Sequence, residues 1–260
     1  MNYENNINEI TENLIPDNNN NEIQLMPLES DKPSSIFLSK TSKISVIILL
    51  ISVLFISNNY LTIESIFSFS PLQTNQCYSD SLFDITSSLN SFFFQNVSYR
   101  NILLITTSFF ADTTVIMAMY LWVFNFKDEL LVFTMLLFYL CRFIIMELIV
   151  FNFPSNYIFS YPGIHSIFVS YLKTNDFFFS GHTGFPAIIF LDFYKKKYYF
   201  VAYFSIITLT LQFFTMLVLH GHYSIDLIVG IFFGIYLYYN CNKLLHWYYK
   251  KVKRSQINSS

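Results

Sequence analysis

Long apolar runs separated by short polar segments follow one another along the chain from Ile44 onward. Each run is close to the ~20 residues that a helix needs to cross a bilayer, and backbone groups in lipid must be hydrogen-bonded internally. The pattern therefore predicts an all-α, polytopic membrane protein built as a bundle of six transmembrane helices. The predicted helices cover residues 44–60, 103–125, 129–151, 177–194, 198–219 and 224–246, of which the fourth is the shortest.

The composition supports hydrocarbon as the solvent of these helices. Hydrophobic residues make up 53% of the 260 residues and charged residues only 12%, whereas a soluble domain carries about 25% charged residues. The cysteines Cys77, Cys141 and Cys241 lie too far apart to form a metal-binding or disulfide motif. We expect no metal, no cofactor and no nucleic acid partner, and homo-oligomerisation stays open.

Residues 1–39 differ from the rest of the chain, because they are polar, rich in Asn and acidic, with no basic residue before Lys32. Such a segment cannot bury enough apolar surface to fold, so we predict a disordered cytosolic leader. It is either a regulatory tail or a low-complexity extension. The predicted organisation is this leader, a transmembrane catalytic domain at 44–249, and a basic cytosolic tail at 250–260.

The basic residues predict the topology. With the N-terminus inside and six alternating helices, twelve of the fifteen lie in inner segments, and only Arg100 and Lys173 lie outside. The inner ones are Lys32, Lys40, Lys43, Lys127, Lys195, Lys196, Lys197, Lys243, Lys250, Lys251, Lys253 and Arg254. This asymmetry predicts cytosolic termini, and an outer face that is lumenal in the endoplasmic reticulum or Golgi, or extracellular at the plasma membrane.

Four of the five histidines fall on that outer side, and His182 belongs to the first of two motifs there. The motif Ser180-Gly181-His182 opens the fourth predicted helix. Free backbone N–H groups and the positive end of the helix dipole at such a terminus suit a phosphate oxygen. The alternative is an ordinary Ser cap beside an interfacial histidine.

The second motif, His220-Gly221-His222, opens the sixth predicted helix and is followed by Asp226. Residues i and i+4 share a helix face, so Asp226 is expected to fix the tautomer of His222 and raise its basicity. That arrangement makes a nucleophile or a base. The alternative is a pair that only caps the helix. Because an even number of crossings separates the two helices, both motifs are expected at one surface, which favours catalysis.

Arg142 is a charged residue inside the third predicted helix, where an unpaired arginine would be costly. Asp112 and Arg142 lie equally far from the turn at Lys127, so the two can share a depth in antiparallel helices. Arg142 either pairs with Asp112 or reaches the substrate phosphate. Gly230 and Gly234 form a GxxxG motif, which indicates close helix packing.

The motifs Ser180-Gly181-His182 and His222-x-x-x-Asp226 resemble those of the type 2 phosphatidic acid phosphatase superfamily. Within it, the chain is most similar to the sphingomyelin synthase-like branch, and also to the plant phosphatidylcholine:diacylglycerol cholinephosphotransferases. The resemblance covers roughly residues 100–240. The phosphatase branch has a Lys-x6-Arg-Pro motif and an arginine where this chain has Met216, so its absence favours a transferase.

The resemblance implies that His222, oriented by Asp226, attacks a phospholipid to form a phosphohistidine, with His182 as general acid and then general base. Ser180, Gly181, Arg142 and His220 would bind the substrate phosphate. The headgroup, most simply phosphocholine, would pass to a lipid hydroxyl of ceramide or diacylglycerol, so the expected partners are these lipids and the bilayer. The rival interpretations are a lipid phosphate phosphatase and an inactive membrane scaffold.

Overall fold

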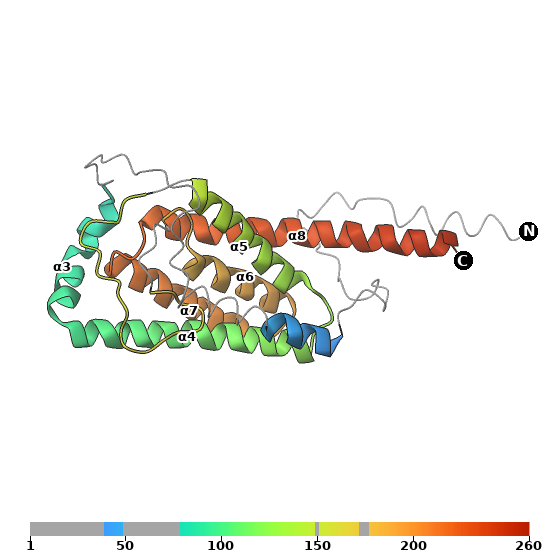
Figure 1. Cartoon of the computed structure of the whole chain (residues 1–260), viewed down its shortest axis with the longest axis horizontal. Helices are drawn as coiled ribbons and strands as arrows, with labels where there is room; N and C mark the ends of the chain where they lie inside the picture. Colours follow the sequence, from blue (N-terminus) through green and yellow to red (C-terminus); the bar gives the residue numbers. More distant parts are fainter. Residues whose placement is uncertain (1–38, 49–78, 149–150, 172–176, 260) are drawn as a thin grey trace, which may run out of the picture. The chain divides into compact units, whose positions relative to one another are not determined.

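In the computed structural model, the described residues are 39–48, 79–148, 151–171 and 177–259, and all of their regular secondary structure is helical (Figure 1). Residues 40–48 form the first described helix. The others are α3 (Ser81–Gln95), α4 (Val97–Phe124), α5 (Leu130–Leu148), α6 (Gly181–Lys195), α7 (Tyr199–Val218) and α8 (Ser224–Ser259). The all-α prediction is confirmed for this part of the chain.

The predicted helices correspond to α4 through α8, but the count of six spans is not confirmed. Three described helices are long and apolar enough to cross a membrane: α4, α7, and α8 over Ser224–Val252. A shorter apolar helix covers Leu130–Ile145 within α5. The first predicted span begins inside helix 40–48 and continues outside the described residues. The long apolar helices make this a membrane protein.

The two clear departures from the prediction are α3 and α6. No helix was predicted between residues 61 and 100, yet α3 occupies Ser81–Gln95 and runs across the Val97 end of α4 (Figure 1). Helix α6 has only 15 residues, which gives ~22 Å at 1.5 Å per residue, short of the ~30 Å hydrocarbon core. One end of α6 therefore lies within the membrane thickness.

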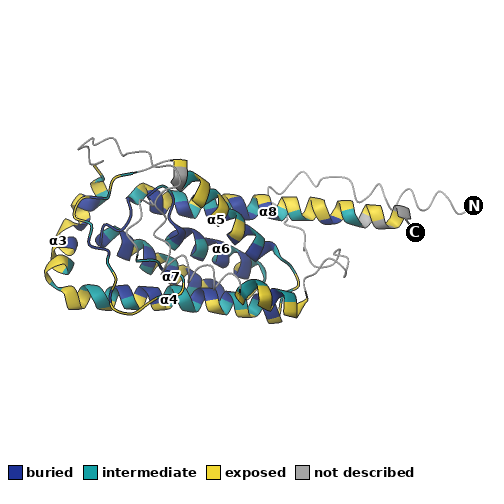
Figure 2. Ribbon diagram, in the orientation of Figure 1, coloured by how far each residue is buried: buried dark blue, intermediate teal, exposed yellow. Residues whose placement is uncertain are grey.

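Helix α6 lies at the centre, where it packs on both α7 and α8, while α4 packs on α7 and α5 packs on α8. Figure 2 shows the buried residues concentrated on α6 and on the inner faces of its neighbours. Ile188, Ile189 and Phe193 of α6 are fully buried. Large apolar side chains such as Phe109 and Phe232 are exposed on the outside, as expected where lipid is the solvent.

Close packing of α6 on α8 depends on glycine, as the GxxxG motif predicted. A Cβ atom on Gly230 would collide with the backbone oxygen of Ser180 and lie 2.7 Å from Oγ1 of Thr183. One turn further along, a Cβ atom on Gly234 would lie 3.0 Å from the backbone oxygen of Gly184. Any larger residue at Gly230 would push the two helices apart at the level where α6 begins.

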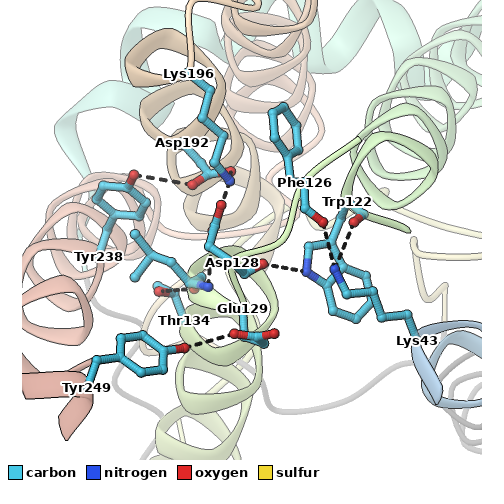
Figure 3. A network of polar contacts seen from close by, with 11 residues as sticks. Lys43, Trp122, Phe126, Asp128, Glu129, Thr134, Asp192, Lys196, Tyr238 and Tyr249 are labelled. Carbon is cyan, nitrogen blue, oxygen red and sulfur yellow. Dashed lines mark hydrogen bonds and ion pairs between the residues drawn. The ribbon is translucent and has the colours of Figure 1, made fainter. Parts of the chain in front are cut away.

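A polar network joins the other ends of the helices (Figure 3). Lys196, which follows α6, contacts Asp192 at 2.7 Å and Asp128 at 3.1 Å, and Tyr238 of α8 donates to Asp192. Lys43 of helix 40–48 donates to the backbone oxygens of Trp122 (3.2 Å) and Phe126 (2.7 Å). These contacts join the ends of α4 and α6 and the segment before α5 to the middle of α8.

Candidate active site

The first turns of α6 and α8 are joined directly by hydrogen bonds. The backbone N–H of Ser180 donates to the backbone oxygen of Asp226 at 3.0 Å. The hydroxyl of Thr183 donates to the backbone oxygen of Leu227 at 2.9 Å. The two motifs found in the sequence therefore meet in the structure, at the place where Gly230 allows the helices to approach.

Ser180 is the N-cap residue of α6, but its side chain makes no capping hydrogen bond. The Ser180 hydroxyl is buried, and it has no hydrogen-bond partner among the described residues. An ordinary Ser cap, one alternative raised by the sequence, is therefore not what the structure contains. A buried hydroxyl beside the first N–H groups of a helix is available to a ligand oxygen.

His182, in the first turn of α6, and His222, in the turn between α7 and α8, face each other. Their ring centroids are 5.5 Å apart with an interplanar angle of 64°. Phe159 packs edge-on against His182 at 6.1 Å, and Phe177 packs edge-on against His222 at 5.9 Å. Two imidazoles held at this spacing are close enough for one phosphate group to contact both.

Asp226 lies next to His222, although α8 begins only at Ser224 and the two do not share a helix. Nδ1 of His222 is 3.6 Å from Oδ2 of Asp226, which is beyond hydrogen-bond distance. The same Oδ2 accepts a hydrogen bond from the backbone N–H of Tyr223 at 3.1 Å. The carboxylate is thus fixed by the turn, with Nδ1 of His222 turned toward it.

The environment of His222 lowers its basicity, contrary to the prediction from the His–Asp spacing. Burial lowers the pKa of His222 well below its usual value, and neighbouring His182 and Arg142 lower it further. His222 is only 5% exposed, so placing a positive charge there is costly. The imidazole is therefore neutral at pH 7, with a lone pair available for attack.

Arg142 reaches the first turn of α6, which separates the two alternatives for this residue. A Cβ atom on Gly181 would collide with Nη1 of Arg142, so the glycine makes room for the guanidinium. Asp112 faces other partners, because its carboxylate accepts hydrogen bonds from Ser166, Ile167 and Phe168. The position of Arg142 favours the approach to a substrate over a pair with Asp112.

His220 takes a different position from the one expected of a phosphate ligand. It is 2% exposed, and its Nδ1 lies 2.6 Å from the backbone oxygen of Ser155. Its ring stacks on Phe83 of α3 with centroids 4.0 Å apart. These contacts join α3 to the connection after α5, so a phosphate-binding role for His220 stays a prediction that its described contacts do not support.

Asp80 is a residue of the site region that the sequence reasoning missed. Its carboxylate accepts hydrogen bonds from the backbone N–H (2.7 Å) and the hydroxyl (3.0 Å) of Ser224, and from the backbone N–H of Leu82 (3.1 Å). It therefore caps α3 and the start of α8 together. The local signal was an Asp at the N-cap position with Asp84 in the first turn, which marks a helix start.

Within the described ranges, no three His, Cys, Asp or Glu side chains gather closely enough to hold a metal ion. The side chains that the structure brings together are two histidines, an arginine and an aspartate, beside a buried serine hydroxyl. Nucleophile, proton donor and cation are the groups that a phosphoryl transfer requires.

The fold and the site together define the class of this molecule. It is a helical membrane protein in which two histidines lie side by side where the first turns of α6 and α8 meet. A family model described as AtPDCT1/2 matches residues 79–243, which is more than half of the chain and includes every residue of the site. The chain therefore belongs to the AtPDCT1/2 family, that of the phosphatidylcholine:diacylglycerol cholinephosphotransferases. Comparisons with curated proteins and with solved structures found no match.

The family match refines the resemblance drawn from the sequence. Similarity to the cholinephosphotransferases is confirmed, whereas the sphingomyelin synthase-like branch and the phosphatase superfamily receive no direct support. The family implies a lipid enzyme that transfers phosphocholine to diacylglycerol. Ceramide as an acceptor, and with it a place in sphingolipid metabolism, is not supported.

Proposed function

We propose that this protein transfers phosphocholine from phosphatidylcholine to diacylglycerol through a phosphohistidine on His222. The observation that carries the proposal is the 5.5 Å separation of the ring centroids of His182 and His222, where the first turns of α6 and α8 meet. Membership of the cholinephosphotransferase family supports the choice of headgroup and acceptor.

In the first half-reaction, Nε2 of His222 attacks the phosphorus of phosphatidylcholine. Nε2 is the attacking atom because Nδ1 is turned toward Asp226, which orients the ring and stabilises the positive charge that develops. The negative charge of the bound phosphodiester favours the protonated form of His182. The bond from phosphorus to the glycerol oxygen breaks, and protonated His182 donates its proton to the departing diacylglycerol oxygen. Hydrogen bonds that are long in a free enzyme commonly shorten when the substrate binds, so 3.6 Å is compatible with this role.

In the second half-reaction, a different diacylglycerol binds where the first one left. His182, now neutral, takes the proton of the acceptor hydroxyl, and the acceptor oxygen attacks phosphorus. The Nε2–phosphorus bond breaks and His222 is released. Because both displacements occur at one site, the same catalytic side chains serve the donor and the acceptor lipid. The single pair of histidines at the starts of α6 and α8 agrees with this.

Charge on the transferring phosphorus group is stabilised from the α6 side. The guanidinium of Arg142 lies beside Gly181 in the first turn of α6, and the buried hydroxyl of Ser180 precedes the first N–H groups of that helix. Donors fixed in advance in a site of low dielectric constant are the main source of rate enhancement in such reactions. A phosphodiester carries one negative charge, so one guanidinium with helix N–H groups suffices to balance it.

The compartment and orientation are part of the proposal. Twelve of fifteen basic residues would be cytosolic if both termini were, and the histidine site would then face the lumen of the endoplasmic reticulum. Protease protection of an N-terminal tag in sealed microsomes tests this orientation. A digested tag supports it, and a protected tag reverses it.

The reaction is tested with two lipids that differ in their acyl chains. Membranes containing the protein receive phosphatidylcholine with a deuterated choline group and one acyl pair, together with diacylglycerol carrying another pair. Mass spectrometry is expected to find the deuterated headgroup on the second acyl pair, and His222→Ala is expected to abolish that product.

Three other outcomes would contradict the proposal. Release of free deuterated phosphocholine without a new phosphatidylcholine would make the protein a hydrolase. Transfer to added ceramide in preference to diacylglycerol would change the acceptor. Unchanged transfer by the His222→Ala protein would remove the nucleophile.

A further inference from the structure

Two glycines on one face of α6 receive side chains of α5, which lies beside it (Figure 1). A Cβ atom on Gly181 would collide with Nη1 of Arg142, and one on Gly184 would collide with the ring of Phe138. Residues three apart share a face of a helix, so α5 rests on the side of α6 that carries these glycines. Because Arg142 meets the first turn of α6 and the earlier Phe138 meets the next turn, the two helices run antiparallel.

Two aromatic residues lie together at the edge of this contact. The ring of Tyr139 on α5 packs against that of Phe185 on α6, with centroids 4.6 Å apart. Tyr139 is 38% exposed. Among residues 181–189 of α6, His182 and Phe185 are partly exposed and the others are buried. The partly exposed strip of α6 therefore runs from the proposed general acid to a ring that borders the outer surface of α5.

The outer surface of α5 is apolar. Leu136, Leu140 and Phe143 are each more than two-fifths exposed, as expected where hydrocarbon is the solvent. The backbone of a helix satisfies its own hydrogen bonds, so this surface of α5 can lie against acyl chains. The residues that connect it with the histidine pair are here called the α5–α6 seam, and they are Tyr139, Arg142, His182 and Phe185.

Buried side chains close the other sides of the histidine pair. Phe159 packs against His182 and Phe177 packs against His222, and both phenylalanines are buried. Thr183, which is hydrogen-bonded to α8, is fully buried as well. The α5–α6 seam is thus the side on which described residues next to the pair reach a lipid-facing surface.

The order of groups along the α5–α6 seam matches that of a phospholipid. Tyr139 stands at the middle of α5, nine residues from Leu130 and nine from Leu148. Arg142 is three residues, or ~4.5 Å, nearer to the Leu148 end, which is the end beside the first turn of α6. A guanidinium nearer the membrane surface, with aromatic rings below it, fits a phosphodiester whose acyl chains continue toward the bilayer centre.

We propose that the α5–α6 seam binds the diacylglycerol part of the donor phosphatidylcholine, with the phosphodiester at Arg142 and the upper acyl chains against Tyr139 and Phe185. This inference rests on the proposed transferase function, because it assumes that the histidine pair acts on a lipid phosphodiester. It adds the side from which the donor enters, which is the hydrocarbon beside α5. It also places the departing diacylglycerol oxygen next to His182, its proton donor.

Photo-crosslinking tests the α5–α6 seam without requiring turnover. The full-length protein in uncharged maltoside micelles receives a limiting amount of phosphatidylcholine that carries a diazirine in the upper part of one acyl chain. After irradiation, mass spectrometry compares adducts at Tyr139 and Phe185 with adducts at Phe232, an exposed residue of α8 that reports non-specific contact. Adducts of the intact probe and of its diacylglycerol are both counted. Arg142→Leu and Arg142→Lys are treated in the same way.

Adducts in the wild-type protein should concentrate at Tyr139 and Phe185. In Arg142→Leu their yield relative to Phe232 should fall about tenfold, the effect of losing one charge-assisted hydrogen bond to the phosphodiester. Arg142→Lys should retain part of the yield. A glycolipid with the same diazirine chains and no phosphate should show a similar deficit in the wild-type protein, which covers the case in which Arg142→Leu folds poorly.

Two results would overturn the proposal. One is a yield at Tyr139 and Phe185 no higher than at Phe232, and the other is an equal yield from the phosphatidylcholine and glycolipid probes. Headgroup transfer without adducts in the α5–α6 seam would refute this binding site and leave the transferase function intact. Phosphate-dependent adducts in a protein that transfers no headgroup would do the reverse.

Discussion

Asp80 and Ser224, 144 residues apart in sequence, are joined by two hydrogen bonds from Ser224 to one carboxylate, at 2.7 and 3.0 Å. Because Asp80 also accepts a hydrogen bond from Leu82, the starts of α3 and α8 share one cap. Ser224 comes two residues after His222, so the shared cap sets where the chain enters α8. Asp80 is thus a positioning residue for His222 without contacting it.

Replacing Asp80 is therefore expected to affect both stability and turnover. Loss of a helix cap costs about 1 kcal/mol, and two caps are lost here, so Asp80→Ala should lower the unfolding free energy by about 2 kcal/mol. Asp80→Asn keeps one acceptor oxygen and should lose less. Displacement of His222 should lower kcat more than it raises KM, as measured with the deuterated lipid assay and a thermal unfolding series in detergent.

Asp84→Asn is the matched control for Asp80, because Asp84 is an exposed acid in the first turn of the same helix. It should change kcat and the unfolding midpoint little. If Asp80→Asn and Asp84→Asn had equal effects on kcat, the shared cap would not position His222.

The lowered pKa of His222 predicts how stability depends on pH. An unfolded histidine takes up a proton near pH 6.5, whereas burial, together with His182 and Arg142, keeps folded His222 neutral to lower pH. Between these two pKa values the unfolded state binds more protons, so stability falls as pH falls below about 6.5. One such group contributes a slope of at most about 1.4 kcal/mol per pH unit.

Thermal unfolding of the detergent-purified protein at pH 7.5 and pH 5.5 measures this slope. Acidification should lower the midpoint of the wild-type protein relative to that of His222→Asn. His220 acts in the same direction as His222, because burial also lowers its pKa, although the backbone oxygen of Ser155 and Asp80 oppose the shift. His165→Asn replaces an exposed histidine and serves as the control. If the midpoint of His222→Asn depended on pH as strongly as that of the wild-type protein, His222 would not contribute to the dependence.

The sequence predicted the helices whose length and composition the bilayer dictates, which are α4, α5, α7 and α8. It missed α3, which crosses the end of α4 and mixes polar with apolar residues, so it shows no long apolar run. It found His182, His222 and Asp226 because each lies at a helix start marked by small residues. The partners of Asp80 and Asp112 are 144 and more than 50 residues away, and no local pattern encodes such contacts.

Gly230 is expected to be required for the close approach of α6 and α8 that brings the two histidine motifs together. A methyl group there would collide with the backbone oxygen of Ser180 and press on Thr183, so Gly230→Ala should separate α6 from α8 at the level of the site. Transfer activity should fall at least tenfold, with a lower unfolding midpoint. Phe232→Ala, on the exposed side of α8, should leave activity within about twofold, since it removes no helix contact of this kind.

Comparing Gly230→Ala with Phe232→Ala distinguishes loss of the α6–α8 contact from a general sensitivity of α8 to substitution. If Gly230→Ala kept full activity while Phe232→Ala lost it, the α6–α8 contact would not control the geometry of the histidines. Equal losses in both would indicate that α8 as a whole is sensitive to substitution.

Arg142 is expected to act on the transferring phosphorus group. Removing one preorganised donor from such a site typically costs about two to three orders of magnitude in turnover, so Arg142→Leu should fall in that range. Arg142→Lys keeps the charge without the planar fork and should recover part of the loss. Phe143→Leu, the exposed next residue on α5, is the control. Equal activities of the Leu and Lys variants at residue 142 would show that its charge is not used.

Asp112 is expected to matter through the loop of residues 159–171, whose backbone it holds, and to differ from Arg142 in its effect. Asp112→Leu would leave the N–H groups of Ile167 and Phe168 without their acceptor at membrane depth, at a cost of about 1–3 kcal/mol each. The unfolding midpoint should therefore fall. Asp112→Asn retains one oxygen and should lie between this variant and wild type. Ile116→Leu on the same helix is the control, and an Asp112→Leu protein with an unchanged midpoint would show that the carboxylate does not hold the loop.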